Sequence, residues 1–485
     1  MSKKYVVAVD QSTSGTKASL LDRNLETVRT ARKPHEQFYP KPGYAEHDAE
    51  EIWQNTAALL KEVTEGIDPE EIVGLGIANQ RETTVLWDRA TGKPVHKAIV
   101  WQDVRAGEIA ARLEPEKERI TYLTGLVPSP YYSAAKAAHV LKEDPQLMER
   151  ARNGEICFGT VDSYLLYRLT GGKSFATDLT NASRTQLLDI HACRWSEELA
   201  KDFDIPFCCL PDKVLPCDSD FGVVETIDTL KGVHITSMMG DSHASLYGHG
   251  CIKAGMVKTS YGTGSSIMMN IGHEPVLSNN GLSTSIGYAA EGQVHYVLEG
   301  NITCSADTLV WVRDSLELIH SMDELDAAGT VESTDGVYLV PAFSGLGAPW
   351  FDEKAKAIIY GMNRGTTKAH VLRAALASIA HQNADVLDAM SKDTGVPVTH
   401  LKADGGGSVN KLLMQMQSDY TPCAVAVSAE KELTQRGVAI MAGQRFGFFE
   451  SEAFSPVAAV YEPKMAEEER LKERAGWADA LARTR

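Results

Sequence analysis

Two carboxylates stand where predicted strands end, and they are the residues best suited to catalysis. Asp10 follows the apolar, β-branched run at residues 5–9, and Asp241 comes shortly after the run at residues 235–239. A carboxylate at the end of a buried strand is costly unless a cation lies close by. We therefore expect one acid to hold Mg²⁺ and the other to accept a proton from a hydroxyl group. For Asp10, the alternative is an Asx hydrogen bond within the next turn.

Two turns rich in glycine and hydroxyl residues share one pattern. Residues 11–17 read Gln-Ser-Thr-Ser-Gly-Thr-Lys between two predicted strands, and residues 262–266 read Gly-Thr-Gly-Ser-Ser in the same setting. Tight turns of this composition point backbone N–H groups at an anion such as a phosphate. An ordinary hairpin turn is the alternative for each, and the sequence has no Walker A motif. The repeated strand–turn–strand pattern indicates two related domains, each with one phosphate-binding hairpin.

Other predicted strands also end in polar or glycine-rich residues. Arg81 and Glu82 follow the strand at residues 72–77, and Trp101 follows the one at residues 98–100. Arg81 and Glu82 can hydrogen-bond one polyhydroxylated ligand, with a surface ion pair as the alternative. Trp101 can supply an apolar wall for a small carbon backbone. The glycines at 405–407, before a predicted helix, would let the backbone approach a phosphate or a purine ring.

These residues must be positioned by strands that alternate with helices, which is the pattern of an α/β sheet with its site at the strand ends. The sequence predicts helices over residues 49–63 and 369–390, from residue 410 onward, and on the surface over residues 465–485. At 485 residues the chain is too long for one hydrophobic core. We expect two domains, residues 1–248 and 249–485, which meet at a short hinge near residues 247–250 and close over the site.

The overall charge excludes two classes of partner. There are 48 Lys and Arg residues against 65 Asp and Glu, a net charge of −17 that repels nucleic acids and anionic membrane surfaces. No apolar run approaches the roughly 18 residues of a membrane span, and the N-terminal run is too short for a secretory signal. The eight cysteines show no metal-binding spacing, so we expect reduced, mostly buried thiols in a cytoplasmic protein.

Five stretches carry a family resemblance: residues 78–84, 98–102, 158–163, 180–185 and 341–349. Through them the chain resembles the FGGY carbohydrate kinases, and within them the glycerol kinases, from Tyr5 to about Asp479. The resemblance implies two ribonuclease-H-like domains around a central cleft, a fold related to actin and hexokinase. It also implies transfer of a phosphoryl group from ATP, with Mg²⁺, to a small polyol.

The resemblance assigns roles on the phosphate side of the site. It implies that Asp241 is the general base and lies beside the metal, which Asp10 helps to hold. It implies contacts to the nucleotide phosphates from Thr13, Ser14, Gly15 and Lys17 in the first domain and from Thr263 in the second. It implies an adenosine site lined by Gly406 and Asn410.

On the substrate side, the resemblance implies a glycerol site lined by Arg81, Glu82, Trp101 and Tyr131. Two neighbours depart from the glycerol kinases: Ser242 stands where they usually carry Gln, and Ser266 where they carry an aromatic residue. Both replacements are smaller and leave room for about one or two more hydroxymethyl groups or waters. We expect both serines to line the substrate, with a tetritol, a pentitol or a xylulose-like ketose as the alternative to glycerol.

Further departures from the glycerol kinases concern the nucleotide site and inhibition by a sugar phosphate. Ala306 and Val310 replace the usual Gly and Gln, which predicts a rebuilt edge of the nucleotide site. Residues 229–234 lack the glycine-rich loop through which some relatives bind a fructose bisphosphate, so we expect no inhibition by that compound.

A non-catalytic relative is disfavoured because the acids, Lys17 and Thr263 are all present. An actin-like filament protein is also disfavoured, because it would not need the substrate residues Arg81, Glu82 and Trp101. The oligomeric state stays open, with a homodimer or a homotetramer as the possibilities.

Overall fold

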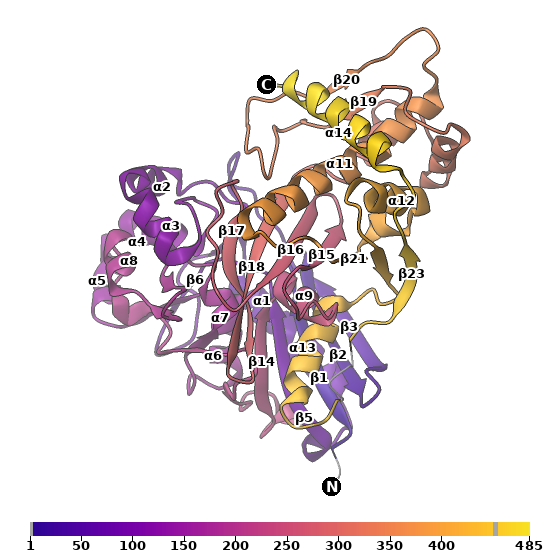
Figure 1. Ribbon diagram of the computed structural model, residues 1–485. Helices are drawn as coiled ribbons and strands as arrows, with labels where there is room; N and C mark the ends of the chain where they lie inside the picture. The colour runs from indigo at the N-terminus through magenta and orange to yellow at the C-terminus, as the bar shows by residue number, and fades with distance from the viewer. Residues whose placement is uncertain (1–2, 450–453) are drawn as a thin grey trace.

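The structure, a computed structural model, describes residues 3–449 and 454–485 and contains two large sheets (Figure 1). The first sheet has six strands in the order β13-β14-β5-β1-β2-β3. Their bounds are β1 (Tyr5–Gln11), β2 (Gly15–Asp22), β3 (Thr27–Pro34), β5 (Ile72–Asn79), β13 (Gly222–Val223) and β14 (His234–Gly240). Strands β1, β5 and β14 run parallel, so their carboxyl ends meet at one edge.

The second sheet has seven strands in the order β17-β18-β16-β15-β21-β22-β23. Their bounds are β15 (Met256–Tyr261), β16 (Ser265–Gly272), β17 (Ser283–Ala290), β18 (Gln293–Ile302), β21 (His400–Asp404), β22 (Val425–Ser428) and β23 (Val457–Tyr461). Strand β15 pairs with β16 as a hairpin and with β21 in parallel, just as β1 pairs with β2 and β5. This equivalence confirms the predicted internal repeat of strand, turn and strand.

Helices cover both faces of the first sheet. Along β1, alternate side chains point to opposite faces, as in any strand. Val7 and Val9 pack with α1 (Ala49–Thr64) and α6 (Val161–Leu169). Val6 and Ala8 pack with α13 (Leu433–Gln444), which comes from the far end of the chain. The predicted division at residue 248 stays a prediction, and α13 crosses it.

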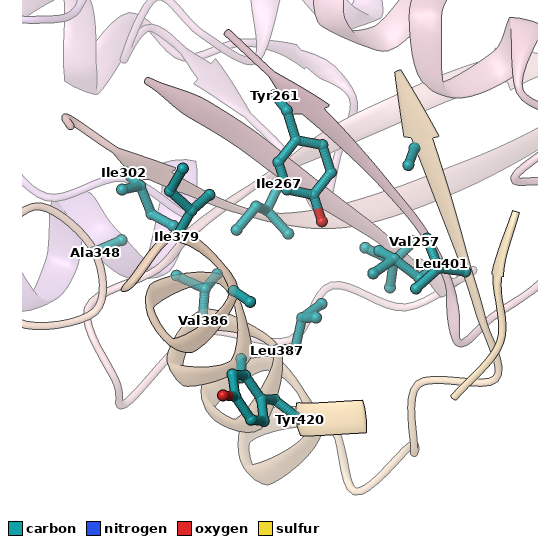
Figure 2. Close-up of a cluster of buried hydrophobic side chains, with 14 of the residues drawn as sticks. Val257, Tyr261, Ile267, Ile302, Ala348, Ile379, Val386, Leu387, Leu401 and Tyr420 are labelled. Carbon is teal, nitrogen blue, oxygen red and sulfur yellow. The ribbon is translucent and has the colours of Figure 1, made fainter. Parts of the chain in front are cut away.

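The second sheet is covered on one face by α11 (Lys368–Thr394) and α12 (Lys411–Tyr420). Figure 2 shows Val257, Ile267 and Leu401 of the sheet gathered with Val386 and Leu387 of α11 in one apolar cluster. On the other face, Leu246 of α9 (Asp241–Gly248) packs against side chains of β16 and β18. The central strands of the sheet are therefore buried on both sides, whereas β23 at its edge is largely exposed.

Helices α9 and α13 lie against each other between the two sheets. A Cβ at Gly437 would collide with the carbonyl oxygen of Ala244, and one at Gly248 would lie 2.5 Å from the carbonyl oxygen of Leu433. Glycine is required at both positions because the two backbones approach too closely for any side chain. This contact fixes α9, which begins with Asp241, relative to both sheets.

The remaining elements surround these two layers. A separate apolar cluster holds together a group of helices, α2 (Gly107–Arg112), α3 (Lys117–Thr124), α4 (Ser133–Glu143), α5 (Pro145–Arg152) and α8 (Glu197–Asp202). Short strands pair as β4 (Glu46–His47) with β7 (Ala98–Ile99), β6 (Val85–Asp88) with β8 (Ile156–Gly159), β9 (Ala176–Asp178) with β12 (Lys213–Leu215), β10 (Leu188–Asp189) with β11 (Arg194–Trp195), and β19 (Tyr338–Val340) with β20 (Ile358–Tyr360).

Two predicted elements are present but differ in detail from the expectations. The run at residues 98–100 forms only the two-residue strand β7, which pairs with β4 and not with the large sheet. The C-terminal helix α14 (Glu467–Ala482) is not merely a surface helix, because Trp477 is 1% exposed and donates to Asp385 of α11 over 2.9 Å. Ala480 and Leu481 are buried beside Trp477, and Arg474 donates to Asp385 and Asp388, but the many charged residues of the helix hid this contact in the sequence.

The thiols and the helices agree with the broad expectations. All eight cysteines are free, and Cys208 is the exposed one among them. Within the described ranges, no helix has both the length and the apolar character that crossing a membrane requires.

Candidate functional site

Asp10 and Asp241 lie at the same edge of the first sheet. Asp10 is the sixth residue of β1, and Asp241 begins α9 directly after β14. Burial raises the pKa of Asp10 to about 7, and the charge of Asp241 adds to this effect. Its Oδ1 atom is buried and has no hydrogen-bond partner among the described residues. A buried carboxylate oxygen without a donor, beside a second carboxylate, is suited to a bound cation.

The carboxylates of Asp10 and Asp241 suit Mg²⁺ better than a metal ion whose ligands all come from protein side chains. Across residues 3–449 and 454–485, no group of three or more His, Cys, Asp or Glu side chains could hold a metal ion. Mg²⁺ is usually bound by one or two carboxylates, with water and phosphate oxygens as its other ligands. The chemistry of Asp10 and Asp241 therefore fits the role of protein ligands to such an ion when a nucleotide is bound.

The first hairpin places its predicted phosphate ligands next to Asp10. The backbone N–H of Ser12 donates to the carbonyl oxygen of Gly15 over 2.9 Å and closes the turn, with Thr13 and Ser14 at its tip. A Cβ at Gly15 would lie 2.7 Å from a backbone oxygen of β3, so glycine is required there. Lys17 pairs with Asp10 in the strand register and forms an ion pair with Glu432, the residue before α13.

The second hairpin, between β15 and β16, repeats this geometry. Thr263 is exposed at its tip, and the carbonyl oxygen of Thr263 accepts from the N–H of Ser305 over 2.8 Å. The backbone of Ala306 donates in turn to Gly262 over 3.1 Å. The turn is thus tied to the start of α10 (Asp307–Asp314), which carries the variant residue Val310. Each sheet offers one such tip at an edge where parallel strands end.

The predicted adenosine residues follow the end of β21. Gly405 has φ of 86°, and a Cβ there would lie 2.6 Å from the carbonyl oxygen of Tyr261. A Cβ at Gly406 would meet nothing within 4 Å. Packing therefore explains the first glycine, whereas the open space beside Gly406 suits a ligand. Asn410 caps α12 by accepting from the backbone of Leu413 over 2.9 Å.

Arg81 and Glu82 do not form the surface ion pair that was the alternative interpretation. Both are buried, at 6% and 2% exposure. Arg81 donates to both carboxylate oxygens of Glu299, over 2.8 and 2.7 Å, while Arg184 donates to Glu82 over 2.6 Å. Arg184 also lies 3.1 Å from Glu299. Two arginines and two glutamates thus form one neutral buried network between the strands of both sheets.

Electrostatics and backbone geometry set this network apart from an ordinary ion pair. Burial by itself would raise the pKa of Glu299, but Arg184 and Arg81 together hold it well below its usual range. Glu82 has φ of 59°, a left-handed conformation that residues with a side chain rarely adopt. Such strain persists where the surroundings impose it, often at active sites. Arg81 reaches the catalytic edge through its Nε atom, 3.4 Å from Oδ1 of Asp241.

Trp101 and Tyr131 lie together, as a wall for a small substrate requires. Their ring centroids are 5.7 Å apart, and Nε1 of Trp101 donates to the hydroxyl of Thr13 over 2.9 Å. The substrate wall is therefore tied to the first hairpin. The buried Lys136 donates to the carbonyl oxygen of Tyr131 and holds its loop in place.

The two variant serines each accept a hydrogen bond from a cation. Ser242, the second residue of α9, accepts from Nη2 of Arg81 over 3.3 Å. Ser266 accepts from Nζ of the buried Lys258, also over 3.3 Å. Two cavities, of about 800 and about 510 Å³, lie elsewhere and include none of the predicted site residues.

Sequence reasoning missed four charged residues of the site: Glu299, Arg184, Lys258 and Lys136. Each is a buried charge, at 2% exposure or less. The signal that could have found Glu299 and Lys258 is a single Glu or Lys inside a predicted strand, because a buried charge there needs a partner. For Arg184, its place in one of the five family stretches was the available sign.

Comparison with known proteins agrees with this architecture. Residues 5–248 match the N-terminal domain of the FGGY family of carbohydrate kinases, and residues 257–445 match its C-terminal domain. Glycerol kinase of Shewanella baltica (strain OS185) is 42% identical over 494 aligned residues that cover all of both chains. Glycerol kinase of Halorhodospira halophila (strain DSM 244 / SL1) is also 42% identical and is covered over 97% of its length.

A solved structure shows the same fold. The crystal structure of Plasmodium falciparum glycerol kinase with ADP has a TM-score of 0.94 and 34% identity, and the match covers 100% of this chain and 98% of that one. Two ribonuclease-H-like halves, the paired hairpins and the family match over both halves lead to one conclusion. The chain belongs to the FGGY family of carbohydrate kinases.

Proposed function

We propose that this kinase transfers the γ-phosphoryl group of ATP to a terminal hydroxyl group of glycerol, with Asp241 as the general base. The observation that carries the proposal is the position of Asp241. Its side chain is 31% exposed, and it lies beside Arg81 at the edge where Asp10 needs a cation. The names of the full-length relatives support glycerol as the acceptor.

The base acts by taking a proton from the attacking hydroxyl group. Arg81 contacts Asp241 through Nε and Glu299 through both Nη atoms, so the guanidinium holds the carboxylate in one orientation. Glu82 has one oxygen engaged by Arg184 over 2.6 Å, and its other oxygen can accept from a polyol hydroxyl. Trp101 and Tyr131 would cover the carbon chain and exclude water from the reacting oxygen.

The two hairpins would grip the phosphates from opposite halves of the molecule. Thr13, Ser14 and Gly15 offer N–H and hydroxyl donors from the first sheet, and Thr263 offers the same from the second. Lys17 adds a positive charge, which Glu432 neutralises when no nucleotide is bound. Gly406 and Asn410 would face the adenosine. Mg²⁺, with Asp10 and Asp241 as protein ligands, would neutralise charge on the phosphates.

The proposal extends to the cellular location and the oligomeric state of the enzyme. The need for ATP and the eight free thiols support a cytoplasmic location. A homo-oligomer, dimer or tetramer, remains compatible with the chain, and sedimentation of the purified protein would determine which form is present.

The function is tested by product formation. Purified protein is incubated with Mg-ATP and glycerol, and ADP release is followed together with the mass of the phosphorylated product. We expect one ADP for each glycerol phosphate formed, and no ADP above background when glycerol is omitted. ADP release that does not depend on any polyol or ketose would exclude the proposal.

A further inference from the structure

A buried histidine joins two glutamines beside the first hairpin. His47 is the second residue of β4 and is fully buried. Its Nε2 atom lies 2.7 Å from Oε1 of Gln37, and its Nδ1 atom lies 3.3 Å from Nε2 of Gln80. The proposed function gives none of these three side chains a role.

Backbone carbonyl groups fix the direction of the hydrogen bonds in this chain. Gln37 donates through Nε2 to the carbonyl oxygen of Thr13 over 2.8 Å, so its amide oxygen is left to accept from Nε2 of His47. Gln80 donates through Nε2 to the carbonyl oxygen of Ser12 over 3.4 Å, so its amide nitrogen faces Nδ1 of His47 as a donor. His47 is therefore the neutral tautomer that donates through Nε2 and accepts through Nδ1.

Burial keeps the ring in this neutral form. It lowers the pKa of His47 to about 3, and the neighbouring His35, whose ring centroid lies 4.5 Å away, adds to this effect. A proton on Nδ1 would point at the amide nitrogen of Gln80, which is itself a donor. The chain of Gln37, His47 and Gln80 thus persists at neutral pH, where the ring is uncharged.

The chain ends on the peptide groups at the tip of the hairpin. In a planar trans peptide, the C=O group of one residue and the N–H group of the next point in opposite directions. Holding the carbonyl groups of Ser12 and Thr13 therefore also directs the N–H groups of Thr13 and Ser14. Gln11 adds a second hydrogen bond to the carbonyl oxygen of Ser12, over 2.8 Å. Among the described residues, neither of the two N–H groups has an acceptor, so both are open to an anion.

From this geometry we infer that His47 is a positioning residue for nucleotide binding, which acts through Gln37 and Gln80 to align the N–H groups of Thr13 and Ser14 before the phosphates bind. The inference rests on the proposed function and concerns the nucleotide side of the site. Donors that are already aligned bind more tightly, because less conformational freedom is lost on binding. Loss of the imidazole would let both glutamines turn, and the cost would fall on the nucleotide rather than on the polyol.

Nucleotide binding and turnover are measured separately. The Kd for Mg-ADP is measured by isothermal titration calorimetry without glycerol, and kcat and KM are measured for ATP and for glycerol. His47→Phe removes both nitrogens but keeps an aromatic ring, and it should raise the Kd for Mg-ADP and the KM for ATP by about ten-fold. The KM for glycerol should change by less than about three-fold.

Two variants separate the hydrogen bonds from the packing of the ring. His47→Gln carries a donor and an acceptor on one flat group, as the imidazole does, and should retain a Kd closer to that of the wild type. Gln37→Met breaks the chain at its half-buried end and should raise the Kd for Mg-ADP about as much as His47→Phe. His381→Phe is the matched control, since His381 is also buried but lies in α11 against Tyr420 and Trp477, and it should leave the Kd within about two-fold of the wild type.

The possible results distinguish this inference from the proposed function. A Kd for Mg-ADP that stays within about two-fold of the wild type in Gln37→Met, and in His47→Phe where it folds, would overturn the inference and leave the proposed function standing. So would a KM for glycerol that rises as much as the KM for ATP, because a general loss of structure affects both substrates. Absence of Mg-ADP binding and of turnover in the wild-type protein would overturn both.

Discussion

At the scale of single residues, Asp10 carries a cost in the ligand-free protein. Its Oδ1 atom is buried without a donor, and its pKa is raised to about 7 by burial and by Asp241. The proton-linked stability is fully present below the ordinary pKa of 3.8 and is lost as the pH rises through about 7. Above that pH the folded protein holds an unpaired buried charge, which Mg²⁺ with a nucleotide would neutralise.

Asp10→Asn should therefore stabilise the metal-free protein at pH above about 7 while it weakens binding of Mg-ATP. The rise in pKa from 3.8 to about 7 corresponds to at most about 4 kcal/mol. Thermal unfolding in the presence of a chelator would show a gain in stability that grows with pH and vanishes at acid pH. A variant that is less stable than the wild type at alkaline pH would show that Asp10 has a partner in solution.

The sequence placed the candidate site residues at strand ends but did not reveal their partners. Asp10 lies near the end of a strand, and Asp241, Arg81 and Glu82 follow strands; polar residues at strand ends can be read from a short stretch of chain. Glu299 lies 218 positions from Arg81, and no local pattern connects them. A buried charge pair of this kind is visible only when the fold has brought the two sheets together.

At the scale of elements, the network of Arg81, Glu82, Arg184 and Glu299 joins strand β18 to the end of β5. Glu299 contacts both Arg81 and Arg184, so removing its charge leaves the two buried arginines with only Glu82 and the partly exposed Asp241 as counter-charges. The cost of breaking such a pair exceeds that of breaking an exposed one, because the remaining charge stays out of water.

Glu299→Gln should destabilise the protein by about 3–5 kcal/mol, as is typical for the loss of one partner from a buried ion pair. Glu71→Gln is the matched control, since its partner Lys4 is 52% exposed, and it should cost about 1 kcal/mol or less. Urea unfolding of the two variants measures both values. Equal costs for the two substitutions would contradict the structural role that we assign to the network.

Elements with a strong local pattern were predicted well. The β1–β2 and β15–β16 hairpins follow from β-branched runs around glycine-rich turns, and α11 follows from its apolar periodicity. The strand at residues 98–100 was misplaced because apolar runs do not reveal which partner they pair with. The absence of inhibition by a fructose bisphosphate, expected from residues 229–234, stays a prediction that an inhibition assay can test.

At the scale of the whole molecule, the crossing of α9 and α13 connects the two sheets. Helix α13 packs on the first sheet, and Leu246 of α9 packs on the second. Gly437 allows the two backbones to touch. Since Asp241 begins α9, we expect a shift at this crossing to alter the position of the proposed base relative to both hairpins.

Gly437→Ala should therefore impair both stability and catalysis. The added methyl group would collide with backbone atoms of α9, which cannot move away as a flexible side chain can. We expect a loss of about 3 kcal/mol or more in the free energy of unfolding and a lower kcat in the protein that remains folded. Gly107→Ala is the control, because a Cβ at Gly107 would meet nothing within 4 Å. A Gly437→Ala protein that matched this control would show that the helices are not in close contact.

The central claim is that Asp241 removes the proton of the attacking hydroxyl group in an ATP-dependent phosphorylation of a small polyol. The most direct test is the steady-state rate of glycerol phosphate formation by Asp241→Asn, whose side chain keeps its shape and loses its basicity. We predict a kcat at least about 100-fold below the wild-type value, with a much smaller change in the KM for glycerol. A variant that retained a kcat within a few-fold of the wild type would contradict the assignment.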